Sequence, residues 1–381
     1  MYNPIFAYIL IVAINIRFFT HKALDGYGNF VKQIVAIWLQ QFPQHHFILI
    51  TDNNLHGLVN TPNSTIVQAG VSARHPILWH LWYNFTLPKI LKKYNAQVFL
   101  SPDGFCSLRT KLPQVMVIHD LAYVALPKMF PKSHLIYFKK IMPTMAYKAK
   151  AICTVSNFSK ADIIEKLKIP AAKLHVVYSG VKPKYMPLTY QVIAQTQQQY
   201  TNGLPYFLHI GTITPRKNIM ALLKAFSQFK RMQKSNIKLV LVGKVPNNYK
   251  AFKTQLSNYK YRADVVLIET CTDATLAHIL GSAYALVYPS LYEGFGVPPL
   301  EAMQAGVPVI ASGVTAIPEI CGNAAHYIDP QNINDIYNGL KTIYINETYK
   351  NQLIKNGLAH TLQYTWERTA QLIWDVILKV V

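Results

Sequence analysis

Short runs rich in Val, Ile, Leu and Phe alternate along this chain with stretches whose apolar residues recur at helical spacing. In the first half, a helix is predicted over residues 28–40, and strands are predicted over residues 7–15, 47–51, 97–101, 114–119 and 151–155. Continuous apolar runs of this length are typical of strands buried on both faces of a sheet. Strands that alternate with helices form parallel sheets, so the pattern predicts a doubly wound α/β domain.

The alternation falters between Tyr178 and Pro205, where Lys-Pro-Lys, a Gln-rich tract and Asn202-Gly203 follow one another. Turn-forming and polar residues of this kind are typical of a connection between domains. Beyond it the pattern resumes, with strands predicted over 206–210, 238–242, 265–268, 285–288 and 308–311, and helices over 218–232, 273–282 and 300–305. The final segment, residues 366–379, has apolar residues at helical spacing.

The pattern predicts four parts: an N-terminal Rossmann-like domain (1–180), a linker (181–204), a C-terminal Rossmann-like domain (205–362) and a C-terminal helix (363–381). The helix is expected to pack back on the first domain. Ligands of open α/β sheets bind beyond the carboxyl ends of the strands. We therefore expect two facing domains with an interdomain cleft.

Composition supports a folded protein of two domains. The 381 residues are 51% hydrophobic and only 14% charged, which excludes a disordered chain. The net charge of +21 arises because 38 Lys and Arg face only 17 Asp and Glu. Such a surface favours anions, whether nucleic acid, anionic lipid or phosphorylated substrate, although a generally lysine-rich composition would also explain it.

Neither the cysteines nor the apolar opening predicts an extracellular or membrane-spanning protein. The four cysteines lie far apart without a Cys-x-x-Cys pair, which argues against a disulfide framework or zinc site and favours a reducing compartment. The apolar run from Ile5 to Ile16 lacks a basic leader and covers about a dozen residues, whereas a spanning helix needs about 20. We expect it to form a buried parallel strand.

The strongest chemical signal is the loop that follows the strand ending at Ser290. Glycines bracket this loop, and Pro298 marks the start of the next helix, because its missing N–H would be unpaired there in any case. Backbone amides beside the positive end of a helix suit anionic or hydroxyl-rich ligands. Glu293 and Glu301 stand eight residues apart in this segment, although the whole chain has only seven glutamates. The alternative is an ordinary helix cap with two exposed acids.

This segment resembles the E-x7-E signature of the retaining glycosyltransferases of family 4 (group 1), which adopt the GT-B fold. The resemblance implies that Glu293 and the amides of Gly294, Phe295 and Gly296 hold the donor sugar. It also implies that Glu301 binds the ribose hydroxyls of the nucleotide. By the same resemblance, the domain over 1–180 is acceptor-binding and the domain over 205–362 is nucleotide-sugar-binding.

A second element joins a predicted strand to a helix and contains adjacent cations, Arg216 and Lys217. Point charge, guanidinium geometry and the helix dipole would all attract a diphosphate there. The stretch from Gly211 to Asn218 is similar to the Gly-Thr-x-x-Pro-Arg-Lys-Asn element of the same family, whose cations hold the phosphates. Many relatives have Arg directly after the glycine, but this chain has Thr212, so Arg216 is the only arginine of the element. A chance pair of surface cations is the alternative.

Two candidate sites lie in the first domain. His119-Asp120 follows a predicted strand and resembles the family's His-Asp element, whose histidine contacts the donor sugar or stabilises developing charge. A structural role is the alternative for one of 13 histidines. Gly26 and Gly28 precede the first predicted helix and resemble the family's Gly-rich turn against phosphate or acceptor. They do not complete the G-x-G-x-x-G fingerprint, because residue 31 is Val.

Two lesser matches complete the resemblance. The stretch from Thr154 to Lys160 resembles a Ser-x-x-Ser-Lys turn and, on physical grounds, reads as a helix cap. Pro318-Glu319 is similar to a Pro-Glu element, in which we expect Glu319 to be architectural. The matching elements run in the family's order from about residue 24 to residue 320.

No Asp-x-Asp and no His/Cys/Asp cluster with ligand spacing occurs, so we expect no metal and no cofactor. Fixed cations and helix dipoles would then neutralise the departing diphosphate. Together with the resemblance, this predicts a metal-independent, retaining glycosyltransferase that moves a hexosyl unit, mannosyl by resemblance, from a GDP- or UDP-linked sugar. The acceptor would be a glycan or a lipid-linked molecule in surface polysaccharide biosynthesis.

The same charge pattern suggests a further partner and leaves rival functions open. Aromatic residues over 77–85 precede Lys89, Lys92 and Lys93, so a basic amphipathic face could rest on an anionic membrane, and we expect a cytoplasmic protein at its inner face. Core aromatics with solvated lysines are the alternative.

A nucleotide-sugar epimerase or a phosphorylase would share the two-domain frame. A non-catalytic polyanion-binding protein would explain the charge, although no nucleic-acid module is present.

Overall fold

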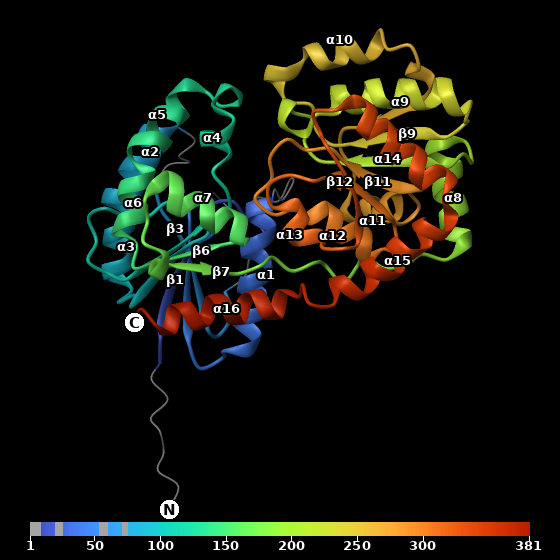
Figure 1. Ribbon diagram of the computed structural model, residues 1–381. Helices are drawn as coiled ribbons and strands as arrows, with labels where there is room; N and C mark the ends of the chain where they lie inside the picture. The colour runs from blue at the N-terminus through green and yellow to red at the C-terminus, as the bar shows by residue number, and fades with distance from the viewer. Residues whose placement is uncertain (1–8, 20–25, 53–59, 71–74) are drawn as a thin grey trace, which may run out of the picture. The chain divides into compact units, whose positions relative to one another are not determined.

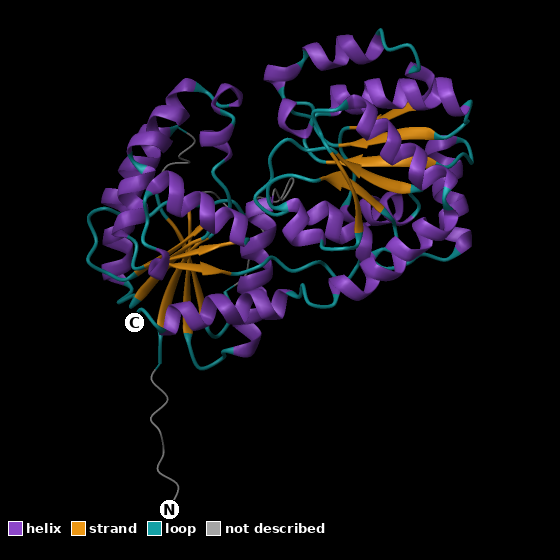
Figure 2. Ribbon diagram, viewed as in Figure 1, coloured by secondary structure: helices purple, strands orange, loops and turns teal. Residues whose placement is uncertain are grey.

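The computed structural model describes residues 9–19, 26–52, 60–70 and 75–381. It divides into two compact units (Figure 1). The first comprises residues 1–180 together with 366–381, and the second comprises residues 181–365. In both units helices flank a sheet of parallel strands (Figure 2).

The sheet of the first unit has seven strands in the order β3-β2-β1-β4-β5-β6-β7. Their bounds are β1 Ile11–Asn15, β2 His46–Thr51, β3 Ser64–Gln68, β4 Val98–Ser101, β5 Gln114–Ile118, β6 Ala151–Thr154 and β7 Leu174–Val176. Ala13 in β1 pairs with Ile48 of β2 on one side and Phe99 of β4 on the other. The order of the strands therefore reverses between β1 and β4, in the middle of the sheet.

The helices of the first unit are α1 Gly26–Gln41, α2 Pro76–Leu81, α3 Leu87–Lys93, α4 Ala122–Ala125, α5 Lys132–Lys140, α6 Met142–Lys148, α7 Asn157–Leu167 and α16 Trp366–Leu378. A π-helical turn, Trp82–Thr86, joins α2 to α3. The last helix, α16, packs on α1: Trp374 lies edge-on to Trp38 with 5.3 Å between ring centroids, and Trp38 Nε1 donates to the carbonyl of Ala370 at 3.1 Å. Its apolar face thus completes the core of the first unit.

The sheet of the second unit has six strands in the order β10-β9-β8-β11-β12-β13. Their bounds are β8 Tyr206–Ile210, β9 Lys238–Val242, β10 Val265–Ile268, β11 Ala285–Tyr288, β12 Val309–Ser312 and β13 Ala325–Ile328. The helices are α8 Tyr190–Thr201, α9 Ile219–Gln233, α10 Ala251–Ser257, α11 Asp273–Gly281, α12 Val297–Gln304, α13 Ile317–Cys321, α14 Ile333–Ile345 and α15 Glu347–Thr361. Counted within the unit, this is the 3-2-1-4-5-6 order of a Rossmann sheet.

The prediction of two doubly wound parallel α/β domains is confirmed. The predicted linker over 181–204 is wrong in detail, because these residues belong to the second unit and include α8. Gln is a good helix former, Thr189 caps α8 by accepting from the amide of Val192, and Asn202 ends it in a left-handed conformation. The helix predicted over 300–305, with Pro298 marking its start, spans Val297–Gln304. Strands β3, β7 and β13 were not predicted.

Candidate functional site

The candidate site of the second unit lies where the strand order reverses, beyond the carboxyl ends of β8 and β11. These strands are neighbours, with Leu208 paired to Leu286. A 3₁₀ turn, Pro215–Lys217, follows β8, and the loop of residues 289–296 follows β11. At such a point the connecting segments diverge to opposite faces of the sheet and leave room for a ligand.

One carboxylate and two cations form the centre of this site. The Oε1 atom of Glu293 lies 2.6 Å from Lys217 Nζ, and its Oε2 atom lies 2.8 Å from Arg216 Nη1. The side chains of Lys217 and Glu293 are each 9% exposed, whereas that of Arg216 is 27% exposed. The three side chains predicted to hold phosphate and sugar are therefore brought together, with one positive charge in excess.

The two cations decide the ionisation of Glu293. Burial alone would raise the pKa of this carboxyl group, but Lys217 and Arg216 outweigh burial and lower it to about 2. The group is therefore ionised at neutral pH, and each carboxylate oxygen can accept a further hydrogen bond. An arrangement with one surplus positive charge suits an anionic ligand that bears hydroxyl groups.

Side chains that the sequence analysis missed hold this cluster in place. Lys217 Nζ also donates to the hydroxyl of Tyr288 and lies 4.5 Å from the centre of its ring. Arg216 Nη1 donates to the carbonyl of Tyr292 at 2.7 Å, and the hydroxyl of Thr315 accepts from the amide of Glu293 at 3.2 Å. Thr315 could have been found, because it lies just before the Pro318-Glu319 element, but Tyr288 has the pattern of an ordinary buried strand residue.

Glycines bring the backbone close to the cations. Gly211 follows β8 with a φ of +141°, and a Cβ there would lie 3.2 Å from Lys217 Cε. Gly243 follows the neighbouring strand β9, and a Cβ there would lie 2.0 Å from the carbonyl oxygen of Gly211. Only glycine allows these two turns to approach so closely.

The predicted loop of Gly294, Phe295 and Gly296 leads into α12. Gly296 is the N-cap of this helix with a φ of +112°, and a Cβ there would lie 2.5 Å from Ile317 Cδ1. Phe295 is buried and packs edge-on against Tyr364. Pro298 and Pro299 in the first turn of α12 have no N–H, so the start of this helix offers the amide of Val297 and the positive end of the helix dipole beside the cluster.

Glu301 lies within α12 and is buried. Burial raises the pKa of its carboxyl group to about 7, although Lys182, Lys184 and a hydrogen bond from Tyr185 act in the opposite direction. Both lysines bind Asp273, at 3.1 and 2.9 Å. Tyr185, Lys182 and Lys184 were not predicted as site residues, because they lie in the stretch predicted to be a linker.

The candidate residues of the first unit are His119, Gly26 and Gly28. His119 follows β5, its Nε2 atom lies 3.1 Å from the carbonyl oxygen of Pro102, and its ring packs edge-on against Phe30 of α1. Burial lowers the pKa of His119 to about 4, so the imidazole is neutral at pH 7. Gly26 and Gly28 lie within the first turn of α1 and not in a turn before it. The preceding Leu24 and Asp25 lie outside the described residues.

Neither a metal-binding cluster nor a membrane-spanning helix is found among the described residues. No group of three or more His, Cys, Asp or Glu in the described ranges could hold a metal ion. None of the helices formed by these residues combines the length and apolar character needed to cross a membrane. The predicted roles of individual site residues, and the absence of a metal requirement, stay predictions.

Comparison with known proteins assigns both units to related families. A family described as glycosyl transferases group 1 matches residues 194–360, and one described as glycosyltransferase family 4 matches residues 38–185. The chain is 30% identical over 290 residues to the O-antigen chain mannosyltransferase B of Escherichia coli, and the aligned region covers 74% of each chain.

Solved structures resemble the whole chain. Sucrose-phosphate synthase from Thermosynechococcus elongatus superposes with a TM-score of 0.78 at 18% identity, covering 97% of this chain and 98% of the other. HepE from Anabaena in complex with UDP-glucose superposes with a TM-score of 0.76 at 14% identity, covering 97% of this chain and 100% of the other.

Proposed function

Since the chain belongs to the group 1 glycosyltransferases of family 4, we propose that its second unit binds a nucleoside-diphosphate sugar at the Glu293 cluster. The chain is a glycosyltransferase with the two-domain GT-B fold, as predicted. The observation that carries the proposal is the convergence of Lys217, Arg216 and Glu293 beyond the carboxyl ends of β8 and β11. A cluster with one surplus positive charge at this place in a Rossmann sheet suits a sugar diphosphate.

Each part of the donor has a counterpart among the described side chains. The diphosphate lies against Lys217, Arg216 and the N-terminal end of α12, where charge and helix dipole act together. Glu293 accepts hydrogen bonds from the sugar hydroxyls, and the amides of residues 294–296 donate hydrogen bonds to them. Glu301, whose pKa of about 7 allows it to be ionised in the bound state, accepts from the ribose hydroxyls.

We propose transfer with retention at the anomeric carbon and without a metal ion. The bond between the anomeric carbon and the phosphate oxygen breaks, and the acceptor oxygen bonds to that carbon from the same face. The acceptor's proton passes to the departing phosphate. Lys217 and Arg216 stabilise the charge that develops on this phosphate, the contribution that a metal ion makes in other transferases. His119, neutral at pH 7, acts by resemblance as a hydrogen-bonding partner of the sugar.

The names of the relatives suggest the substrates. An O-antigen mannosyltransferase at 30% identity supports a mannosyl donor and an acceptor in O-antigen or lipopolysaccharide synthesis. Nucleotide-bound HepE supports a nucleoside-diphosphate donor, although it holds UDP-glucose. Mannose as the sugar favours GDP as the nucleotide, and the reaction would take place on the cytoplasmic side.

Thermal stabilisation by nucleotides tests the donor site. GDP, UDP and ADP, each with EDTA, are added to wild type, Lys217→Met and Glu301→Ala. We expect one diphosphate to raise the melting temperature of wild type and not of the two variants, because ligands that bind only the folded state stabilise it. Lys355→Met is the matched control, since Lys355 is an exposed lysine of the same unit. No stabilisation by any diphosphate would exclude the donor site.

The products test the chemistry. Incubation with GDP-mannose or UDP-sugars and a lipid-linked or glycan acceptor should release the nucleoside diphosphate in EDTA. An α-linked product from an α-linked donor, identified by its one-bond C1–H1 coupling constant, supports retention. Inversion, or activity that requires Mg²⁺, would contradict those parts of the proposal while leaving the donor site intact.

A further inference from the structure

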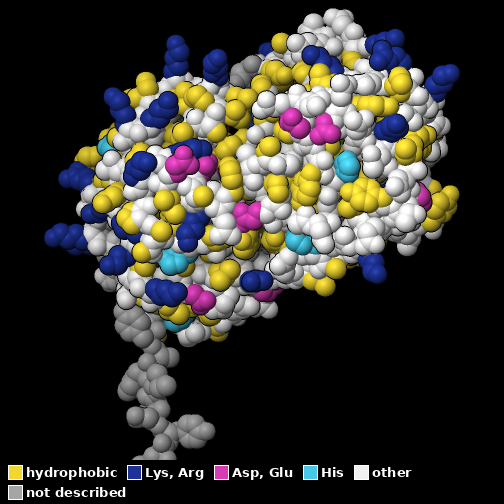
Figure 3. Space-filling view, viewed as in Figure 1, with side chains coloured by type: hydrophobic (Ala, Val, Ile, Leu, Met, Phe, Trp, Pro, Cys, Tyr) yellow, Lys and Arg dark blue, Asp and Glu magenta, His cyan; other side chains and the backbone are white. Residues whose placement is uncertain are grey.

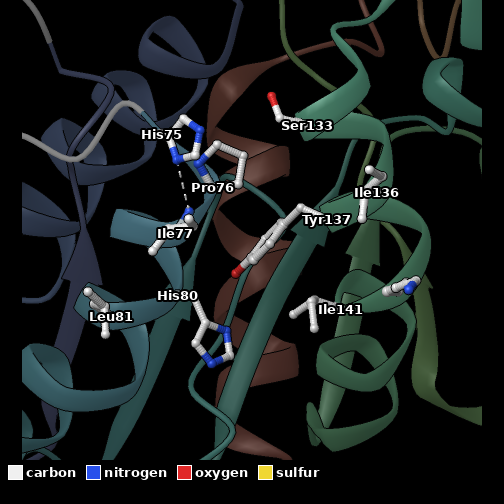
Figure 4. Close-up of a pocket in the computed structure, with 10 residues that line it drawn as sticks. His75, Pro76, Ile77, His80, Leu81, Ser133, Ile136, Tyr137 and Ile141 are labelled. Carbon is white, nitrogen blue, oxygen red and sulfur yellow. Dashed lines mark hydrogen bonds between the residues drawn. The ribbon is translucent and has the colours of Figure 1, made fainter.

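An apolar groove in the first unit is lined by none of the candidate donor-site residues. It runs between α2 and α5, has a volume of about 490 Å³, and is lined by residues that include Pro76, Ile77, Leu81, Ile136, Tyr137 and Ile141. Figure 4 shows Ile77 and Leu81 on the α2 side and Ile136 and Ile141 on the opposite side, with the ring of Tyr137 between them. Apart from two imidazoles, the Ser133 and Tyr137 hydroxyls and Lys140, the lining side chains are hydrocarbon.

The rim of this groove exposes large apolar side chains to solvent. Ile77 is 63% exposed, Ile136 is 58% exposed and Leu81 is 47% exposed. Phe85, in the π-helical turn that continues α2, is 47% exposed as well. Single exposed apolar side chains are common, but several along one groove mark a surface that contacts something apolar.

The stretch of sequence that contains the groove is strongly basic. Between His75 and Lys150 the only carboxylates are Asp103 and Asp120. The same stretch contains eleven cations: Lys89, Lys92, Lys93, Arg109, Lys111, Lys128, Lys132, Lys139, Lys140, Lys148 and Lys150. Lys140 lines the groove, and Lys139 beside it at the end of α5 is exposed. Figure 3 shows Lys and Arg side chains standing out along the edge of this unit.

We propose that the groove and its rim form a docking surface for a bilayer that contains anionic lipid. A polyanion such as nucleic acid would account for the lysines but not for the exposed Ile77, Leu81 and Ile136. An apolar protein partner would account for the isoleucines but not for a surface almost without acids. An anionic lipid surface presents hydrocarbon and negative charge together, and amphipathic surfaces bind it through both.

The two contributions act at different depths. The rim side chains enter the boundary between headgroups and acyl chains, about 5–10 Å deep. The lysines stay at the level of the phosphates, and their long stems allow the charged ends to remain in water. This interaction needs neither a sugar donor nor an acceptor, so it stands or falls independently of the proposed transfer reaction.

Sedimentation with lipid vesicles tests the proposal on the full chain. We expect binding to vesicles of phosphatidylglycerol and phosphatidylcholine in equal parts and little binding to pure phosphatidylcholine. Raising the salt concentration should weaken binding without abolishing it, because screening removes only the electrostatic part. Duplex DNA serves as a polyanion without hydrocarbon and should bind more weakly than the vesicles at the same salt.

Paired variants separate the two contributions. Ile77→Ser with Ile136→Ser should reduce vesicle binding about tenfold or more, because two apolar side chains that would be buried in the bilayer are removed. Lys139→Glu with Lys140→Glu should reduce it by a similar factor and lessen the salt dependence. The matched controls are Ile345→Ser and Lys355→Glu in the second unit, where Ile345 is 60% exposed and Lys355 is exposed, and neither should change binding.

All substitutions lie at exposed positions, so unchanged melting temperatures and nucleotide stabilisation should show that folding is intact. Vesicle binding unaffected by the isoleucine pair would overturn the proposal in favour of electrostatic adsorption. DNA binding as tight as vesicle binding would overturn it in favour of a polyanion surface. A dimer in solution that dissociates with Ile136→Ser, without vesicle binding, would show that a second copy covers the groove.

Discussion

Lys217 Nζ lies 2.6 Å from Glu293 Oε1, although 76 residues separate the two in the chain. Both side chains are almost completely buried, so each charge depends on the other. Because Rossmann topology makes β8 and β11 neighbours, it brings the loop after one strand against the loop after the other. The ion pair therefore links the integrity of the site to the fold of the second unit.

Replacing Lys217 with Met keeps the approximate length of the side chain and removes its charge. It leaves Glu293 buried with Arg216 alone, and we expect a loss of stability on the order of 3 kcal/mol, because breaking a buried pair leaves a charge uncompensated. Chemical denaturation measures this loss. In a Glu293→Gln background the same substitution should cost clearly less. Equal costs in the two backgrounds would show that the pair is not coupled.

The pH dependence of stability should reveal Glu293. Its pKa is lowered from 4.5 to about 2, so the folded protein binds this proton less readily than the unfolded chain. The stabilisation is complete above pH 4.5 and is lost as the pH falls toward 2. Wild type should therefore lose stability relative to Glu293→Gln across this window. A stability difference between wild type and Glu293→Gln that does not change with pH would contradict an ionised carboxylate paired with two cations.

Glu301 should show the opposite behaviour. Its pKa is raised from 4.5 to about 7, so the folded protein keeps this proton longer than the unfolded chain. Wild type should lose stability on the order of 2–3 kcal/mol between pH 4.5 and 7, and this loss should be absent from Glu301→Gln. The variant should melt higher than wild type at pH 8 yet bind the nucleoside diphosphate more weakly. Higher stability with undiminished nucleotide binding would exclude Glu301 from the ribose site.

The His119 imidazole should stay neutral at pH values well below the usual pKa of histidine. Its pKa is lowered from 6.5 to about 4 because burial disfavours the charged ring. The unfolded chain takes up this proton more readily, so His119 should reduce stability as the pH falls from 6.5 toward 4. Titration of ¹⁵N-labelled histidine by NMR, with His119→Gln to assign the signal, measures the pKa directly. A midpoint near 6.5 would show a solvated imidazole.

The sequence predicted the architecture well because buried parallel strands leave continuous apolar runs. It predicted every central strand of both sheets, with bounds that differ from the structure by a few residues. It missed β3, β7 and β13, which lie at sheet edges, where partly exposed strands lose that signature. The linker prediction is wrong because Pro, Gln and Asn-Gly are typical of a loop, whereas local capping by Thr189 and Asn202 favours α8.

The candidate site was predictable where charge is local in sequence and unpredictable where it depends on packing. Arg216, Lys217, Glu293 and Glu301 stood out as motifs. That Glu293 binds both cations could not be read from the sequence, because it depends on the pairing of β8 with β11. The same holds for Tyr288 and Tyr185, which have no motif and come into contact with the site only through the fold.

The close approach of Gly243 to Gly211 allows a steric test of the site. A Cβ at Gly243 would lie 2.0 Å from the Gly211 carbonyl oxygen, and the φ of +152° is rarely adopted by other residues. Gly243→Ala must therefore move the turn that precedes Lys217, and we expect it to abolish stabilisation by nucleoside diphosphates and lower the melting temperature. Gly313→Ala is the matched control, because a Cβ there lies no closer than 3.6 Å to any neighbour. If Gly243→Ala bound nucleotide as the control does, the turn after β8 would not shape the donor site.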